Sequence, residues 1–351
     1  MRDRIRVLVL GTGQMGSGII RLVLEKPGLE LVGAYGRRAE RAGTDIGQAV
    51  GLRRPLGLSI SSELDNLIER SKPDVAIQAT CSRLDDAMAE IVTLLRRGVR
   101  TISIAEEMAF PARRFPEAAR EIDRLAKASN AAVLGTGINP GFVLDLLVIV
   151  LTGVCSDVQS ITATRVNDLS DYGPSVLEKQ GVGVAPEQFQ RGLENGSVVG
   201  HIGFVESIHM IARALGWEID RIEETRKPII SKVRRETAFV TVAPGEVAGC
   251  LHTAVAYRGG RALITLVHPQ EIHPELADVE TGDTIEIVGT PSLRFYTKPE
   301  IPGGAGTIGL AVNTIPRVLA AAPGLYSMAD LPVPSAMMAD VRALIPHTHG
   351  R

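Results

Sequence analysis

A glycine-rich turn near the N-terminus constrains the fold more than any other feature of this sequence of 351 residues. It follows the apolar run Ile5–Leu10 and reads Gly11-Thr12-Gly13-Gln14-Met15-Gly16. Gly11 permits a tight turn, Gly13 lets the backbone approach a pyrophosphate, and Gly16 allows a helix to pack closely on the strand. The helix that follows offers free N–H groups and the positive end of its dipole to phosphates. The segment therefore predicts a dinucleotide-binding strand, turn and helix, against the alternative of a tight turn without a ligand.

The first half of the chain alternates between two hydrophobic periods. Short apolar or β-branched runs predict strands at Ile5–Leu10, Leu29–Tyr35, Val75–Ala79, Thr101–Ile104 and Ala132–Leu134. Helical patterns lie between most of them, at Met15–Glu25, Ser62–Arg70, Leu84–Arg97 and Pro116–Ser129. Because parallel strands need crossover connections, this alternation predicts an α/β fold with a doubly wound parallel sheet of the Rossmann type.

The second half follows a different pattern, in which apolar runs are separated by turn signals. These runs predict strands at Val158–Val166, Thr237–Val242, Cys250–Tyr257, Ala262–His268 and Thr284–Val288, and helical patterns lie at Pro186–Asn195 and Val205–Leu215. Gly259-Gly260 between two of the runs is a hairpin signal. We therefore expect a Rossmann domain at residues 1–140 and a second α+β domain, built on a mostly antiparallel sheet, at residues 141–302. Residues 303–351 are expected to return to the first domain through a helix at Gly303–Ala321, with a disordered tail at residues 347–351.

The composition excludes several classes of protein. Lys and Arg number 38 against 40 Asp and Glu, a net charge of -2 that argues against a nucleic-acid partner and against a polybasic membrane protein. Cys81, Cys155 and Cys250 are widely separated and match neither a disulfide framework nor a metal-ligand spacing, so no metal site is expected. The apolar stretch Leu146–Val154 is about half of a membrane span. We therefore expect a soluble, cytoplasmic globular protein.

Two arginines at the end of the second expected strand bear on the choice of cofactor. The strand ends in Tyr35-Gly36-Arg37-Arg38 and carries no carboxylate that would bind the ribose hydroxyls of NAD. Arg37 and Arg38, with Arg41 as a further candidate, could instead hold a 2′-phosphate through charge-assisted hydrogen bonds. The alternative is a solvated turn. The sequence therefore favours NADP, with NAD as the second choice.

The candidate catalytic residues follow the carboxyl ends of later strands, where ligands bind in a doubly wound sheet. Thr80-Cys81-Ser82 could flank the nicotinamide, and Asn139 could bind its carboxamide or cap a helix. Glu106-Glu107 follows the fifth strand, and a carboxylate in a partly dry pocket exchanges protons near neutrality. The alternative is a pair of acids that only decorate a helix N-terminus. Six residues of the second half could line a substrate pocket, namely Arg165, Asn167, Asp168, Tyr172, His201 and His268.

These motifs resemble the 2,4-diaminopentanoate dehydrogenase family, which includes native amine dehydrogenases and belongs to a wider dihydrodipicolinate-reductase-like group. The resemblance covers the whole chain and rests on the glycine turn, on Glu106-Glu107, on GTGINPGF at residues 135–142 and on residues 306–325. It implies that a glutamate of the fifth-strand loop is the acid/base, which falls on Glu106 or Glu107. Glu107 is slightly favoured, because related sugar dehydrogenases place a catalytic lysine second in a comparable loop. The resemblance also makes Asn313 a candidate for cofactor binding.

The reaction that this resemblance implies is reversible and needs no metal. The glutamate takes a proton from a substrate ammonium, hydride passes to the nicotinamide, and water hydrolyses the iminium. In reverse, a ketone and ammonia give an amine. A diamino acid substrate needs a cation for its carboxylate, and Arg165 or His201 could supply it. The alternatives are a ketone or aldehyde reductase that does not use ammonia and a non-catalytic NADP-binding protein. A homodimer through the second-domain sheet is expected, because few helices cover that sheet.

Overall fold

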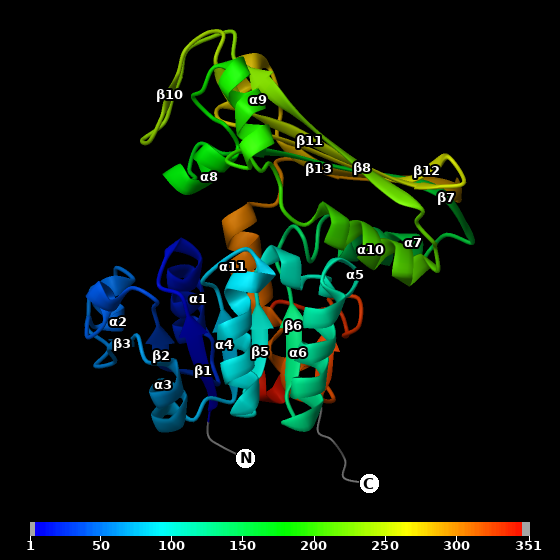
Figure 1. Ribbon diagram of the computed structural model, residues 1–351. Coiled ribbons are helices and arrows are strands. Elements are labelled where there is room, and N and C mark those ends of the chain that lie inside the picture. Colours follow the sequence, from blue (N-terminus) through cyan, green and yellow to red (C-terminus); the bar gives the residue numbers. More distant parts are fainter. Residues whose placement is uncertain (1–3, 346–351) are drawn as a thin grey trace. The chain divides into compact units, whose positions relative to one another are not determined.

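The computed structural model describes residues 4–345, which form two compact units (Figure 1). The first unit contains the chain up to Phe142 and again from Pro302 onward, and the second unit contains Val143–Ile301. The tail predicted to be disordered lies outside the described residues. Within residues 4–345, no helix is long and apolar enough to cross a membrane.

The first unit is built on a sheet of seven strands in the order β15-β6-β5-β4-β1-β2-β3. All the neighbouring strands pair in parallel, and their bounds are β1 (Ile5–Leu10), β2 (Leu29–Tyr35), β3 (Ile60–Ser61), β4 (Val75–Gln78), β5 (Arg100–Ser103), β6 (Ala132–Gly135) and β15 (Gly324–Tyr326). The order 3-2-1-4-5-6 is that of the Rossmann fold, so the predicted fold class is confirmed. The late strand β15 extends the sheet beyond β6.

Helices connect these strands and cover the sheet. They are α1 (Gln14–Glu25), α2 (Ile46–Ala49), α3 (Leu64–Ser71), α4 (Leu84–Arg96), α5 (Pro111–Arg114), α6 (Pro116–Ala128), α11 (Gly303–Asn313) and α12 (Ile315–Ala320), with short 3-10 turns η1 (Ala39–Arg41), η2 (Glu106–Met108) and η4 (Val341–Leu344). The single helix predicted at Gly303–Ala321 is interrupted at Thr314, two residues before Pro316, because proline lacks an N–H and its ring disfavours a continuous helix. Helix α11 packs closely on α1, since a Cβ added at Gly18 would lie 2.2 Å from Cδ1 of Ile308.

The second unit contains a sheet of six strands in the order β14-β13-β7-β12-β11-β8. The bounds are β7 (Asp157–Asp168), β8 (Arg221–Ile230), β11 (Val247–Arg258), β12 (Arg261–Glu271), β13 (Gly282–Thr290) and β14 (Leu293–Thr297). Only the pair β12 and β7 is parallel, so the predicted mostly antiparallel sheet is confirmed. Gly259 and Gly260, at φ +55° and +78°, form the predicted hairpin between β11 and β12.

The remaining elements of the second unit are α7 (Leu146–Thr152), α8 (Pro174–Lys179), α9 (Pro186–Asn195), α10 (Phe204–Leu215) and η3 (Pro274–Ala277). The strand predicted at Thr237–Val242 is confirmed only at its last two residues, Thr241–Val242. Residues there form a small hairpin of β9 (Arg235–Glu236) and β10 (Thr241–Val242), because Oγ1 of Thr237 accepts hydrogen bonds from the amides of Phe239 and Val240 and closes a turn.

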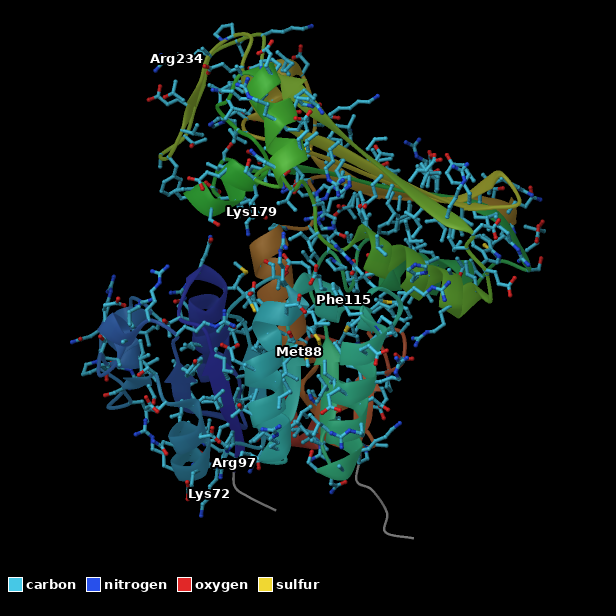
Figure 2. All side chains as sticks on the ribbon, in the orientation of Figure 1. Lys72, Met88, Arg97, Phe115, Lys179 and Arg234 are labelled. Carbon is cyan, nitrogen blue, oxygen red and sulfur yellow. The ribbon has the colours of Figure 1, made fainter. Side chains whose placement is uncertain are left out.

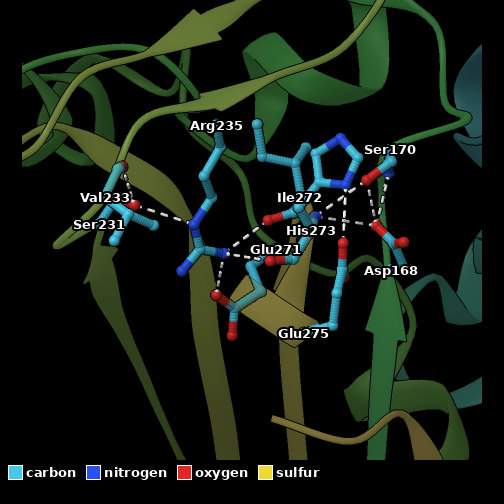
Figure 3. Close-up of polar contacts among 9 residues, drawn as sticks. All are labelled: Asp168, Ser170, Ser231, Val233, Arg235, Glu271, Ile272, His273 and Glu275. Carbon is cyan, nitrogen blue, oxygen red and sulfur yellow. Dashed lines mark hydrogen bonds and ion pairs between the residues drawn. The ribbon is translucent and has the colours of Figure 1, made fainter. Parts of the chain in front are cut away.

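A buried ion pair joins this hairpin to the sheet (Figure 3). Nη1 of Arg235 lies 2.6 Å from Oε2 of Glu271 and also donates to the backbone oxygens of Ile272 and His273. Nε of Arg235 donates to Oγ of Ser231. Arg235 and Glu271 are 2% and 3% exposed, so the desolvated charges are compensated by each other and by these hydrogen bonds.

Candidate active site

The three glycines of the N-terminal turn occupy three sterically different positions. Gly11 has φ +108°, and a Cβ there would lie 2.4 Å from the backbone oxygen of Ala79, which follows β4. A Cβ at Gly16 would lie 2.0 Å from the backbone oxygen of Gly11, so α1 packs directly on the turn. At Gly13 a Cβ would meet nothing within 4 Å. The exposed backbone of Gly13 is therefore open to a ligand, at the N-terminus of a twelve-residue helix with no acid in its first turn.

This geometry fits the pyrophosphate of a dinucleotide. Residues Gly11, Thr12, Gly13, Gln14, Met15 and Gly16 form the turn, as the sequence suggests, and Gly13 and Gln14 are the exposed members. Thr12 is buried, and its backbone oxygen and Oγ1 both accept hydrogen bonds from Nη1 of Arg41. At least part of the guanidinium of Arg41 therefore holds the turn through these hydrogen bonds to Thr12, a contact that the sequence did not predict.

Arg37, at the tip of β2, is held by a carboxylate from a different element. Its Nε lies 2.7 Å from Oε1 of Glu90 on α4, and its Nη2 donates to the backbone oxygen of Asp86 at 2.6 Å. Burial disfavours the charged guanidinium, but the hydrogen bond and the charge of Glu90 outweigh burial and raise the pKa of Arg37 above its ordinary value. Arg38 is exposed. Glu90 was not among the predicted site residues, although a glutamate within the apolar stripe of α4 is a signal that could have identified it.

The segment after β4 joins this network. Oγ1 of Thr80 donates to Oε2 of Glu90 at 2.5 Å and accepts from Nε2 of Gln78 at 2.7 Å. Sγ of Cys81 lies 3.6 Å from Nη2 of Arg37 and accepts a hydrogen bond from Nε2 of Gln78. The backbone oxygen of Ser82 accepts a hydrogen bond from the amide of Glu107. The β4 loop therefore connects the arginine at the end of β2 with the glutamate pair after β5.

The two adjacent glutamates have different environments. Glu107 is 5% exposed; its Oε2 accepts a hydrogen bond from the amide of Leu84 at 2.8 Å, and its Oε1 lies 3.6 Å from Nη1 of Arg114. Since Leu84 begins α4, Glu107 satisfies one of the free N–H groups of that helix. Glu106, the first residue of η2, is partly exposed. The pair lies at the same carboxyl edge of the sheet as the glycine turn.

Two asparagines were predicted to bind the cofactor. Asn139 precedes Pro140 through a cis peptide bond and lies after β6, at the same edge of the sheet. Oδ1 of Asn313, at the end of α11, accepts a hydrogen bond from the amide of Met337 at 3.4 Å. Asn313 therefore helps to hold the C-terminal segment.

Arg165 and His201, the two candidates for a cation in the second unit, lie in environments that do not favour a net positive charge. Arg165 is 2% exposed, and its Nη1 lies 2.6 Å from Oδ1 of Asp283, which is itself fully buried. Burial lowers the pKa of His201 and His268 well below the ordinary value, and neighbouring histidines and Arg165 act in the same direction. The expectation that Arg165 or His201 supplies a cation stays a prediction that these contacts do not favour, because Asp283 compensates the charge of Arg165 and burial disfavours the charged form of His201.

The other second-unit candidates form two groups. Oδ1 of Asn167 lies 2.9 Å from Nε2 of the buried His268. Oδ1 of Asp168 accepts hydrogen bonds from Ser170 and from the amide of His273 (Figure 3). A hollow of about 380 Å³ adjoins this second group and is lined by Ser170, Asp171, Glu236, Thr237, Ala238, Phe239 and His273. Within the described residues, no cluster of His, Cys, Asp and Glu could hold a metal ion.

Comparison with known families agrees with this architecture. The model of the 2,4-diaminopentanoate dehydrogenase C-terminal domain matches residues 142–347, which is more than half of the chain. The model of the dihydrodipicolinate reductase N-terminus matches residues 5–103, which contain the glycine turn and the first five strands. The first unit is therefore an NAD(P)-binding Rossmann domain.

Individual relatives extend the likeness over almost the whole chain. A 2,4-diaminopentanoate dehydrogenase from Acetoanaerobium sticklandii is 42% identical over 345 residues, covering 98% of both chains. An amine dehydrogenase from Streptomyces virginiae is 25% identical and covers 94% of this chain and 96% of its own length. The solved structure of amine dehydrogenase from Mycobacterium smegmatis superposes with a TM-score of 0.84 at 26% identity, over 94% of this chain and 97% of that one. The chain therefore belongs to the 2,4-diaminopentanoate dehydrogenase family and is a dehydrogenase that acts on a CH–NH2 donor.

Proposed function

We propose that this chain catalyses the reversible oxidative deamination of a diamino acid of the 2,4-diaminopentanoate type, with NADP as the favoured cofactor and Glu106 as the acid/base. The observation that carries the proposal is the difference between the environments of the two glutamates after β5. Glu107 is committed to the amide of Leu84, while the partly exposed Glu106 lies beside it at the edge of the sheet that carries the glycine turn. The relative from Acetoanaerobium sticklandii supports the substrate class.

The choice of Glu106 reverses the slight preference for Glu107 that the sugar-dehydrogenase comparison gave. A catalytic acid/base must reach the proton that it transfers, within hydrogen-bonding distance of the substrate. The two carboxylate oxygens of Glu107 face Leu84 and Arg114, and the residue is 5% exposed. These contacts support a positioning role for Glu107, which fixes the loop on α4. The greater exposure of Glu106 supports its assignment to the proton transfer.

The mechanism needs one carboxylate with two tasks. Hydride leaves the amine carbon only when the nitrogen is neutral, because its lone pair forms the C=N bond, so Glu106 first takes a proton from the substrate ammonium. The nicotinamide supplies the hydride acceptor when the cofactor is bound. Glu106 then releases this proton to solvent, and its carboxylate accepts a proton from the water that attacks the iminium carbon. It returns that proton to the nitrogen of the carbinolamine, so that ammonia leaves as the ketone forms. In the opposite direction, ammonia adds to the ketone and protonated Glu106 gives its proton to the departing water.

The favoured cofactor follows from the end of β2. Arg37 and Arg38 stand where a carboxylate would bind the ribose hydroxyls of NAD, and a guanidinium suits a 2′-phosphate. Arg38 is exposed, and the guanidinium of Arg37 is anchored but 40% exposed in its side chain. These two residues support a preference for NADP over NAD.

An uncovered face of the second-unit sheet supports a homodimer. Along β11 and β12, buried residues alternate with half-exposed ones, and Thr253, Val255, Thr265 and Val267 belong to the half-exposed set. A row of threonine and valine side chains on a flat sheet suits packing against a second copy. Light scattering coupled to size-exclusion chromatography should therefore give twice the mass of the chain.

The proposed reaction is tested by its dependence on ammonia. Purified protein should reduce NADP with 2,4-diaminopentanoate and release ammonia, and should oxidise NADPH with a panel of small keto acids and ketones only when ammonium is present. Alkaline buffer keeps part of the ammonium as free ammonia. NADPH oxidation that is equally fast without ammonium would instead establish a ketone or aldehyde reductase. Binding of NADPH without turnover of any of these substrates would contradict the proposal and favour a non-catalytic role.

A further inference from the structure

Helix α4 supplies a carboxylate at the place where β2 lacks one. The tip of β2 carries Arg37, and the side chain of Glu90 reaches it from α4 with an Nε to Oε1 distance of 2.7 Å. The side chain of Glu90 is 6% exposed, whereas that of Arg37 is 40% exposed. The cation therefore faces the solvent side of the pair, and the carboxylate lies behind it.

Further hydrogen bonds hold the side chain of Glu90 beside Arg37. Its second oxygen, Oε2, accepts hydrogen bonds from Oγ1 of Thr80 at 2.5 Å and from Nε2 of Gln78 at 3.3 Å. Gln78 is fixed in turn, because its Oε1 accepts a hydrogen bond from Oγ of Ser103 at 2.6 Å. The carboxylate of Glu90 therefore has three side-chain partners, and Arg37 is the cation among them.

Arg37 keeps hydrogen-bonding capacity on its outer side. Its Nε is used by Glu90, and its Nη2 by the backbone oxygen of Asp86 and by Sγ of Cys81. Among residues 4–345, no hydrogen bond involves Nη1 of Arg37. Two N–H donors can therefore reach a ribose substituent, but they belong to a pair with no net charge. Such donors can form hydrogen bonds with a ribose hydroxyl as well as with a phosphate. The negative charge of Glu90, however, repels a phosphate dianion through space.

We propose that Glu90 is a specificity-determining residue for the cofactor: by compensating the charge of Arg37, it limits the preference for a 2′-phosphate and lets the adenosine site accept NAD as well as NADP. This inference rests on the proposed use of Arg37 at the ribose and deepens it. Without the carboxylate, Arg37 would present a full positive charge in the same place. Arg38 then adds attraction for the phosphate in either case, so the protein retains some preference for NADP.

The test measures binding of the adenosine half of each cofactor, without substrate or turnover. Isothermal titration calorimetry gives the Kd of 5′-AMP and of adenosine 2′,5′-bisphosphate, and the ratio of the two reports the selectivity for the 2′-phosphate. The variant Glu90→Gln keeps the size and one acceptor oxygen of the side chain but removes its charge. It should raise the selectivity for the bisphosphate by about tenfold, which corresponds to ~1.4 kcal/mol. Arg37→Gln, which removes the cation and leaves the carboxylate, should lower the selectivity below that of the unmodified protein.

A matched control lies at the C-terminal end of the same helix. Arg97, labelled in Figure 2, follows α4 and forms an exposed ion pair with Asp65, with Nη2 and Oδ1 3.0 Å apart. The variant Asp65→Asn changes the net charge of the protein by the same amount as Glu90→Gln and should leave the selectivity within about twofold of the unmodified value. Thermal melting identifies variants that do not fold.

The outcomes separate this inference from the proposed function. If Glu90→Gln leaves the selectivity unchanged or lowers it while the protein remains folded, Glu90 does not oppose the phosphate and the inference is wrong. If Glu90→Gln does not fold, the inference is tested with Arg37→Gln instead. If the selectivity of that variant for the 2′-phosphate is unchanged, Arg37 does not contact the ribose and the inference is wrong. If the unmodified protein binds neither adenosine ligand, the cofactor assignment itself fails, and that failure is visible before any variant is compared.

Discussion

Oε2 of Glu107 accepts a hydrogen bond from the backbone amide of Leu84 at 2.8 Å, so a residue of the loop after β5 caps the first turn of α4. The residue at the helix N-cap, Arg83, makes no capping hydrogen bond with its side chain. Glu107 thereby replaces a local cap with a contact from 23 residues away. One of two adjacent glutamates is thus used to position the loop, whereas its neighbour Glu106 is partly exposed.

The first prediction separates the roles of these two residues. Glu106→Gln should lower kcat by about 10²- to 10⁴-fold, because it removes the proton acceptor, and should leave the melting temperature unchanged. Glu107→Gln retains an acceptor for the amide of Leu84 and should keep kcat within about tenfold of the unmodified enzyme. Glu107→Ala should lower the free energy of unfolding by about 1–2 kcal/mol through loss of the cap. Steady-state kinetics and chemical denaturation give these values, and a kcat that collapses in Glu107→Gln but not in Glu106→Gln would reverse the assignment.

The second prediction uses the glycine turn, where two substitutions of the same kind should act differently. Gly13→Ala adds a Cβ that meets no protein atom within 4 Å, so the fold should tolerate it while the approach of the pyrophosphate is blocked. We expect the Kd of NADP to rise by at least about tenfold, with a change in unfolding free energy below ~1 kcal/mol.

Gly16→Ala provides the contrast, since its Cβ would lie 2.0 Å from the backbone oxygen of Gly11. The turn and α1 must then move apart, at a cost of about 1–3 kcal/mol in stability. Calorimetric binding and urea denaturation of both variants measure the two effects. Equal losses of stability in Gly13→Ala and Gly16→Ala would show that the turn is only structural.

The Rossmann half of the fold could be predicted because its signals are local. Strands β1 and β2 occupy the predicted ranges Ile5–Leu10 and Leu29–Tyr35, since continuous apolar runs are typical of strands that are buried on both faces. The short strands β3 and β15, of two and three residues, are too short to carry a period. Strand β8 reads RIEETRKPII, and its charges and proline are typical of an edge strand but hide the alternation on which prediction depends.

The site could be predicted only where its residues act through their own backbone. The glycine turn was identified because its steric demands lie within six residues of sequence. The partners of Arg37 and Arg165 could not be predicted, since Glu90 lies 53 residues from Arg37 and Asp283 lies 118 residues from Arg165. A sequence shows that an arginine is present but not whether a distant carboxylate compensates it. For the same reason the sequence could not show that Asp283 compensates the charge of Arg165, the residue expected to bind a substrate carboxylate.

The third prediction concerns the buried ion pair of Arg235 and Glu271 in the second unit (Figure 3). Glu271→Ala leaves the guanidinium of Arg235 buried without its counter-charge, so the free energy of unfolding should fall by about 3–5 kcal/mol. The adjacent pair of Arg234 and Glu236, with side chains 68% and 62% exposed, is the control. Glu236→Ala should cost at most about 1 kcal/mol, because solvent screens an exposed pair. Similar losses in both variants would mean that burial does not set the strength of these pairs.

The last prediction concerns the response of the second unit to acid. His252 and His268 are 0% and 4% exposed, and burial lowers the pKa of both imidazoles below the ordinary value. Arg226 lowers the pKa of His252 further and Glu224 partly opposes it, while His201 and Arg165 lower that of His268. Both rings are therefore neutral in the folded state and gain a proton on unfolding at low pH.

The sign follows from this difference in protonation. The stabilising contribution of each histidine is complete above the unfolded pKa of about 6.5 and is lost progressively as the pH falls, by at most about 1.4 kcal/mol per pH unit. His268→Gln has no titrating group at this position and can still donate to Oδ1 of Asn167. Between about pH 6.5 and 5.5, the free energy of unfolding should therefore fall less in this variant than in the unmodified protein, and the difference should reach at most ~1.4 kcal/mol. The free energy of unfolding in urea, measured across this range, tests the difference, with His273→Gln as the control at a more exposed ring. A loss of stability as steep in His268→Gln as in the unmodified protein would mean that His268 does not contribute to acid unfolding.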